Sequence, residues 1–222
     1  MPPSANGRTY QPSRLAAGIC GRELADAAEV MRDHSPFDLA AFQEMMTNVF
    51  CPLNNQFLTG HNDACITNYW ADWDLCHMAS VLAIGILNDD AATYDQAVTY
   101  FKSGAGDGSI EHAVPHLCTD SDGSALGQWQ ESGRGQGHTV KGMGQMGAVC
   151  EMAWNQGDDL DSQGDRRFVK AAQYVAEYNT GRSVPCATCS TSPPCTTTSS
   201  PPRAAETPAR PAAAATSSTS AP

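Results

Sequence analysis

The chain has little positive charge and no long apolar segment. Its 222 residues contain 13 Lys and Arg against 24 Asp and Glu, a formal net charge of -11 at pH 7. A nucleic acid or an anionic membrane surface would need a basic face, so we expect neither as a partner. No apolar run is long enough to span a membrane, and the first residues lack the charged and apolar regions of a signal peptide. A site for an acidic polymer would have to supply its own local positive charge.

Cysteine, by contrast, is abundant. Nine cysteines are unusual for a cytosolic protein of this length and favour an oxidising compartment, and the odd number leaves at least one without an intramolecular partner. Cys186, Cys189 and Cys195 lie close together in the sequence. No histidine accompanies them, and a tetrahedral zinc site needs four ligands, so we predict no metal there.

Composition divides the chain into three parts. We predict a disordered N-terminus over 1–13, a helical domain over 14–182 and a low-complexity Ser/Thr/Pro/Ala tail over 183–222. From Ser183 onward there is no aromatic residue and no Leu, Ile or Met, so burial cannot offset the entropy lost on folding, and we predict disorder. A glycosylated stalk has the same composition, and so does an incorrectly assigned gene end.

The middle part predicts an all-α domain. Apolar residues recur at helical spacing, and no Val/Ile/Thr-rich alternating runs separate them. The predicted helices span 14–33, 39–50, 72–90, 91–104, 139–157 and 166–179, with Asp38 as a cap before the second. The segment 72–90 is apolar on nearly every face, which indicates an inner helix. Two long polar loops, 51–71 and 103–137, are expected to carry binding or catalytic residues.

The first loop contains the sequence "ITNYWADW", with Asn68 close to Trp70 and Trp73. One interpretation is a carbohydrate platform, since aromatic rings stack on sugars and an amide binds hydroxyls or carboxylates. The other is that Asn68 is a turn or cap residue and the tryptophans pack in the core.

The second loop contains "SIEHAVPHLC", in which Glu111, His112 and His116 superficially resemble a helical zinc site. Pro115 would interrupt that helix, so we predict no metal here. His112 remains a candidate for lining a cleft.

The segment "QWQESGRGQGH", 128–138, is too polar for a core and too rich in glycine for an ordinary helix. Free backbone amides and the start of a following helix favour anions, and Arg134 can bind a carboxylate through two hydrogen bonds. A glycine-rich surface loop with one capping hydrogen bond is the alternative.

Three segments in order resemble the alginate lyase family of secreted fungal and bacterial proteins. They are 66–101, "ITNYWADWDLCHMASVLAIGILNDDAATYDQAVTYF", 127–160, "GQWQESGRGQGHTVKGMGQMGAVCEMAWNQGDDL", and 166–179, "RRFVKAAQYVAEYN". The most specific motifs are "QESGRGQGHT" and "AWNQGDDL", and the likeness extends from about residue 21 to 179. The resemblance implies an incomplete (α/α) toroid of helical hairpins with a substrate cleft at one end. It also implies a monomeric extracellular lyase that cleaves a uronic-acid polysaccharide by β-elimination, without cofactor or metal.

The resemblance also implies roles for individual residues. Asn68 would neutralise the substrate carboxylate, Arg134 would stabilise charge and His138 would handle protons. Tyr178 is the candidate catalytic tyrosine, with Tyr69 and Tyr174 as alternatives. Trp70, Trp129, Gln130 and His112 would line the sugar subsites.

The chain departs from the family pattern at several positions, among them Asp161, where relatives carry tyrosine, and two others bear directly on function. Relatives carry aspartate in "GRDQGH" where this chain has Gly135, which removes a carboxylate expected to orient Arg134. Past Asn179 the tail replaces helices that would complete the toroid. An inactive, truncated carbohydrate-binding remnant is therefore the alternative function, and a helical interaction domain with a stalk is the third.

Overall fold

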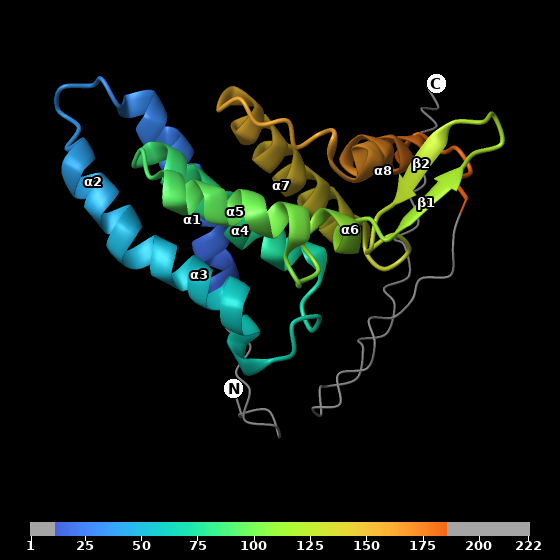
Figure 1. Ribbon diagram of the computed structural model, residues 1–222, viewed down its shortest axis with the longest axis horizontal. Coiled ribbons are helices and arrows are strands. Elements are labelled where there is room, and N and C mark those ends of the chain that lie inside the picture. The colour runs from blue at the N-terminus through green and yellow to red at the C-terminus, as the bar shows by residue number, and fades with distance from the viewer. Residues whose placement is uncertain (1–11, 186–222) are drawn as a thin grey trace, which may run out of the picture.

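Helices make up most of the computed structural model, which describes residues 12–185 (Figure 1). The helices are α1 (Pro12–Met31), α2 (Leu39–Met45), α3 (Cys51–Gly60), α4 (Ala71–Leu87), α5 (Ala91–Ser103), α6 (Ile110–Ala113), α7 (Gln136–Asn155) and α8 (Gln163–Asn179). Strands β1 (His116–Thr119) and β2 (Ala125–Gln128) form a short antiparallel hairpin. The predicted all-α class is confirmed.

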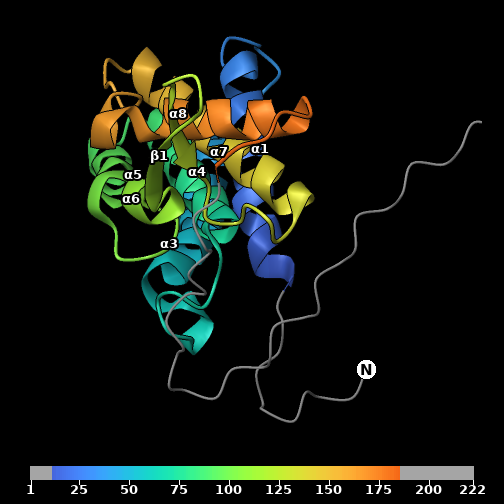
Figure 2. The same cartoon turned by 90° about the vertical axis from the view of Figure 1, so that its right-hand side faces the viewer.

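Helix α4 is the centre of the fold. It contacts α1, α3, α5 and α7, and Leu75, Met78 and Leu82 on it are fully buried (Figures 1 and 2). All of its residues except Ile86 are buried. A helix apolar on nearly every face has neighbours on every side, as the sequence indicated.

The prediction of a loop over 51–71 is wrong for most of that segment. Asp38 caps α2 by accepting a 3.0 Å hydrogen bond from the Ala41 amide, and the helix continues through a π-helical turn, Met46–Phe50, into α3. Pro52 lies directly after the π-helical turn, at the start of α3, and does not end the helix. Only 64–70, after a short 3-10 turn (His61–Asp63), is irregular.

The second predicted loop contains α6 and the hairpin, which the sequence did not predict. Four-residue strands are too short to show an alternating pattern. Strand β2 packs against α8 (Figure 1). A Cβ at Gly127 would lie 2.8 Å from Val114 Cγ1 and 3.1 Å from the Ala171 amide nitrogen, so this close packing requires glycine.

The predicted tail lies outside the described residues from 186 onward, and the predicted N-terminal segment lies outside them up to residue 11. Val184 packs against the main core, two residues past the predicted domain end. Four cysteines of the described part form no disulfide bond: Cys20, Cys51, Cys76 and Cys150. No helix within 12–185 is long and apolar enough to cross a membrane.

Candidate active site

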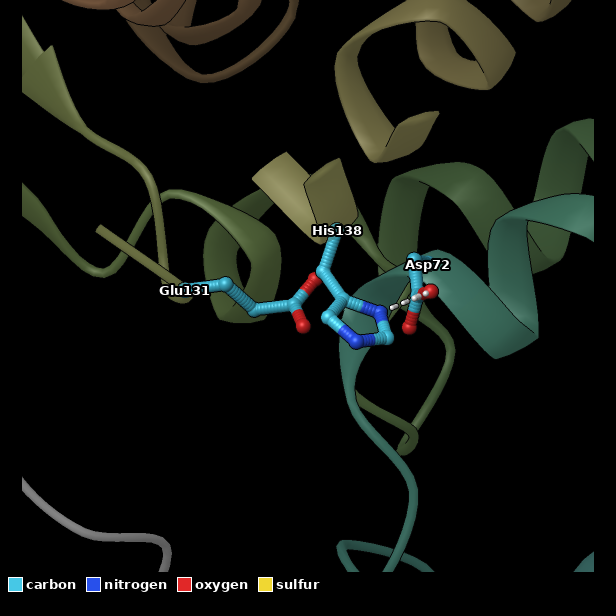
Figure 3. Close-up of side chains that lie close together, drawn as sticks. All are labelled: Asp72, Glu131 and His138. Carbon is cyan, nitrogen blue, oxygen red and sulfur yellow. Dashed lines mark hydrogen bonds and ion pairs between the residues drawn. The ribbon is translucent and has the colours of Figure 1, made fainter. Parts of the chain in front are cut away.

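The candidate site lies where the first turns of α4 and α7 approach the segment that follows β2. Helices α4 and α7 are in direct contact. Asp72 extends from the first turn of α4, His138 from the first turn of α7, and Glu131 from the connecting segment (Figure 3). The three side chains converge although they come from separate elements.

Asp72 is fully buried and holds two side chains of α7 through one oxygen. Its Oδ2 lies 2.7 Å from Lys141 Nζ and 3.1 Å from His138 Nδ1. His138 and Lys141 reach the same carboxylate because residues three apart share one helix face. Burial lowers the pKa of Lys141, but Asp72 outweighs it and the net shift is upward. The other ring nitrogen of His138 points away from Asp72, and half of the side chain is exposed (Figure 3).

Arg134 is held from two sides. Its Nη1 donates a 2.7 Å hydrogen bond to Glu131 Oε1, and its guanidinium carbon lies 4.3 Å from the centre of the Trp70 ring. The arginine side chain is 40% exposed, so donors remain at the surface while the group is fixed in orientation. Glu131 and Trp70 therefore supply the orientation that the sequence had led us to expect from a carboxylate at position 135.

Glu131 is a buried acid that titrates near neutrality. Burial, and secondarily the charge of Asp72, raise its pKa to about 7. Trp129 lies near enough to lower this pKa somewhat, although its Nε1 completes no hydrogen bond with a described residue. Glu131 Oε2 and Asp72 Oδ1 are likewise without a hydrogen-bond partner in the described part of the chain.

Gln130 joins the elements of the site. Its side-chain Oε1 accepts a 3.0 Å hydrogen bond from the Ala71 amide at the start of α4. Its backbone N–H donates to the Ala113 carbonyl at 2.8 Å. Burial raises the pKa of Asp107 to about 6, and a hydrogen bond with Gln130 opposes that shift. The side chain expected to bind sugar thus supports the backbone of the site.

The structure brings some of the predicted residues together. Trp70 and Arg134 are in contact, and His138 meets the helix that begins just after Trp70. Asn68 is half-buried in the irregular segment before α4, where its backbone N–H donates to the Cys65 carbonyl. Tyr178 on α8 is 59% exposed and lines a pocket that also contains Gly133.

Other predicted residues lie elsewhere. Trp129 is fully buried, and a Cβ at Gly142 of α7 would lie 2.5 Å from its Cζ2, so its ring packs in the core and presents no face to a sugar. His112 is exposed on α6, with Nδ1 2.9 Å from the Gly106 carbonyl and 3.1 Å from Ser109 Oγ. The alternative tyrosines also have packing roles: Tyr174 is buried, and Tyr69 lies against aromatic rings.

Sequence reasoning missed Asp72, Glu131 and Lys141. The spacing of His138 and Lys141 on a helix is the signal that could have identified the lysine, whereas nothing local distinguishes Asp72. It also missed a second acid in α4, Asp74. Asp74 accepts hydrogen bonds from the Tyr100 hydroxyl at 2.9 Å and from the Gly108 backbone N–H at 3.0 Å. It also lies 3.0 Å from His61 Nε2. This network fixes the segment after α5.

Comparison with known protein families shows a match over most of the chain. The alginate lyase family model matches residues 3–184, most of the chain. Neither a curated protein sequence nor a solved structure matches it significantly.

Proposed function

The chain belongs to the alginate lyase family of polysaccharide lyases, and we propose that it cleaves alginate, a glucuronan or a similar uronan by β-elimination at the Arg134–His138 site. In this reaction a base removes the C5 proton, the electron pair forms the C4–C5 double bond, and the C4–O bond breaks. The leaving oxygen takes up a proton. The C5 proton is weakly acidic beside an ionised carboxylate, so the site must offset that negative charge.

Arg134 is suited to this charge stabilisation. One nitrogen is bonded to Glu131 and the ring of Trp70 supports the plane, which leaves the other N–H donors for a substrate carboxylate. Asn68 precedes Trp70 by two residues, and its amide is proposed as the second donor to the same carboxylate. A fixed donor costs little reorganisation when charge develops.

His138 is suited to removing the proton. If Nδ1 donates its hydrogen to Asp72, Nε2 carries the free lone pair and points away from the helix contact. Lys141 donates to the same oxygen of Asp72, so the carboxylate accepts from both side chains, which fits this tautomer. Asp72 is then a positioning residue, acting only through His138.

The pocket beside the Arg134 loop is proposed to hold a neighbouring sugar unit. Ser132, Gly133 and Gln136 line one side of it, and Tyr178 and Arg182 line another. Arg182 can attract a uronate carboxylate, and the exposed ring of Tyr178 can stack on a sugar while its hydroxyl serves as a proton donor. Arg134 and Arg182 would offset, at the site, the net negative charge of the chain.

The observation that carries this proposal is the Asp72–His138 contact beside an arginine fixed on Trp70. The test is the ultraviolet absorbance of the unsaturated product, followed with a panel of uronans. We expect turnover by the wild-type chain and by His34→Ala, an exposed histidine outside the site, and its loss in His138→Ala.

Uronan binding without turnover by the wild type would instead support the carbohydrate-binding alternative. If the wild type neither binds nor turns over any uronan of the panel, both functions are refuted. A polymeric substrate of this kind lies outside cells, so the proposal places the protein outside cells. We also propose that it acts as a monomer.

A further inference from the structure

Asp72, Glu131 and His138 form a cluster with the spacing of a metal site. One ligand atom from each residue lies within 4.8 Å of the ligand atoms of the other two. The residues come from α4, from the segment after β2 and from α7, and their side chains lie close together (Figure 3). The 3.1 Å contact between His138 Nδ1 and Asp72 Oδ2 holds the imidazole directly beside the Asp72 carboxylate.

Two oxygens in this cluster provide a second, independent observation. Asp72 Oδ1 and Glu131 Oε2 are buried, and neither has a hydrogen-bond partner among residues 12–185. Buried carboxylate oxygens are normally bonded, because an unpaired one loses its hydration without compensation. Both unpaired oxygens belong to the side chains that have metal-ligand spacing.

The cations already present leave these two oxygens open. Lys141 contacts Asp72 through Oδ2, and Arg134 contacts Glu131 through Oε1. Each carboxylate therefore uses one oxygen for a protein cation and keeps the other. A small cation can bind the open oxygens while both ion pairs remain. It would also relieve the repulsion between two buried acids.

We propose that Asp72, Glu131 and His138 bind one divalent cation of the manganese or zinc type. Two carboxylates favour hard ions such as Mn²⁺, and an imidazole nitrogen favours transition metals over Ca²⁺, which takes six to eight oxygens. Three protein ligands leave positions for water.

The ion competes with the proton chemistry of His138. As a base, His138 needs Nδ1 bonded to Asp72 and Nε2 free. When a ring nitrogen binds the cation, or the ring turns toward it, these two conditions are no longer met together. The cation therefore slows turnover. This consequence rests on the proposed function, whereas binding of the ion does not.

The test uses Mn²⁺, because the nine cysteines of the chain would also capture zinc. The untagged full chain is stripped with chelator and titrated with MnCl₂, and free Mn²⁺ is measured by electron paramagnetic resonance. We expect one ion per chain, with affinity lowered at least ~10-fold in Asp72→Asn, Glu131→Gln and His138→Ala, since each removes a ligand. The exposed His34→Ala is the control and should bind as wild type does.

Circular dichroism checks that each variant is folded, and His138→Ala is the safest because half of that side chain is exposed. No binding at millimolar Mn²⁺, or equal binding by wild type and His138→Ala, would overturn the proposal. Mn²⁺ binding by a chain that turns over no uronan would leave the metal site standing and remove the lyase function. Turnover of a uronan without Mn²⁺ binding would support the lyase function and remove the metal site.

Discussion

Lys141 Nζ lies 2.7 Å from Asp72 Oδ2, the same oxygen that faces His138 Nδ1 at 3.1 Å. The carboxylate accepts from the lysine, and as an acceptor it favours the histidine tautomer with its hydrogen on Nδ1.

Asp72→Asn should lower turnover by ~100-fold or more, because an amide can donate to Nδ1 and stabilise the wrong tautomer. The KM should change little, since Asp72 touches no substrate. Steady-state kinetics and a pH profile of kcat measure this. If Asp72→Asn loses turnover only in proportion to folded protein, the residue is structural and the tautomer argument fails. Asp72→Glu, which keeps the charge, should recover part of the turnover.

Arg134→Ala should also cut turnover by ~100-fold or more, the scale of a lost charge stabiliser. Arg134→Lys should remain impaired, since an ammonium group cannot keep the planar contact with Trp70 and two parallel hydrogen bonds. Lys102→Ala, an exposed cation on α5, is the control for net charge. Wild-type kcat in Arg134→Ala would exclude this arginine from the chemistry.

The sequence predicted most of the helices, although not α3 or α6, and it singled out Arg134 and His138 but not the acids beside them. Arg134 and His138 are recognisable because they lie in a glycine-rich polar segment. Asp72 and Asp74 flank Trp73 in the first turn of a helix whose remaining residues are mostly apolar. Whether such a carboxylate is a surface charge or a buried partner depends on residues far along the chain, here Lys141 and Tyr100.

Packing also reversed two residue-type expectations. Trp129 is a large aromatic in a polar segment, which favoured a sugar platform, but Gly142 on α7 leaves space that its ring fills. The polar segment 51–71 was predicted to be a loop, but residues 51–60 form α3, which continues from the π-helical turn. Neither outcome follows from local sequence, because both depend on where one element lies relative to another.

Gly135→Asp should stabilise the start of α7. Gly135 is the N-cap, its backbone is extended, and it makes no side-chain capping bond. Aspartate is a better cap, by less than about 1 kcal/mol relative to glycine. Its Cβ would lie 3.2 Å from His138 Cδ2, so the ring must move by a few tenths of an ångström and becomes more restricted.

We expect Gly135→Asp to raise the melting temperature slightly and to raise kcat by less than tenfold. Gly135→Ala is the matched control, because it adds the same Cβ without the carboxylate. Equal effects in the two variants would show that crowding of His138, not capping, is responsible. A fall in kcat in both would mean that His138 needs the freedom that glycine gives.

Glu131 should make stability depend on pH. Its pKa is about 7 in the folded chain against 4.5 as the ordinary value, so between these pH values the native state holds more protons than the unfolded state. Stability from this group is therefore present below about pH 4.5 and is lost as pH rises through 7. The full change is roughly 3 kcal/mol, from about 1.4 kcal/mol per pKa unit.

Urea unfolding at pH 5 and pH 8 measures this change. Glu131→Gln stays neutral, so it should flatten the decline; the part due to Asp107, whose pKa is raised to about 6, should remain. Mn²⁺ should restore stability to the wild type at pH 8 more than to Glu131→Gln. An identical pH dependence in the two proteins would show that Glu131 is ionised in the folded chain at neutral pH.

Removing metal should not abolish turnover. Charge stabilisation in the proposed mechanism comes from Arg134 and Asn68, so chelator-treated protein should cleave a uronan at least as fast as untreated protein. Added Mn²⁺ should slow it, because the ion engages His138, and excess chelator should restore the rate. The same titration on His34→Ala should give the same inhibition curve. Complete loss of turnover on chelation, reversed by Mn²⁺, would instead mean that the ion at Asp72 and Glu131 takes over stabilisation of the substrate carboxylate. His138 would then act as a metal ligand, and the base would have to be another group, with Tyr178 in the adjoining pocket as the first candidate.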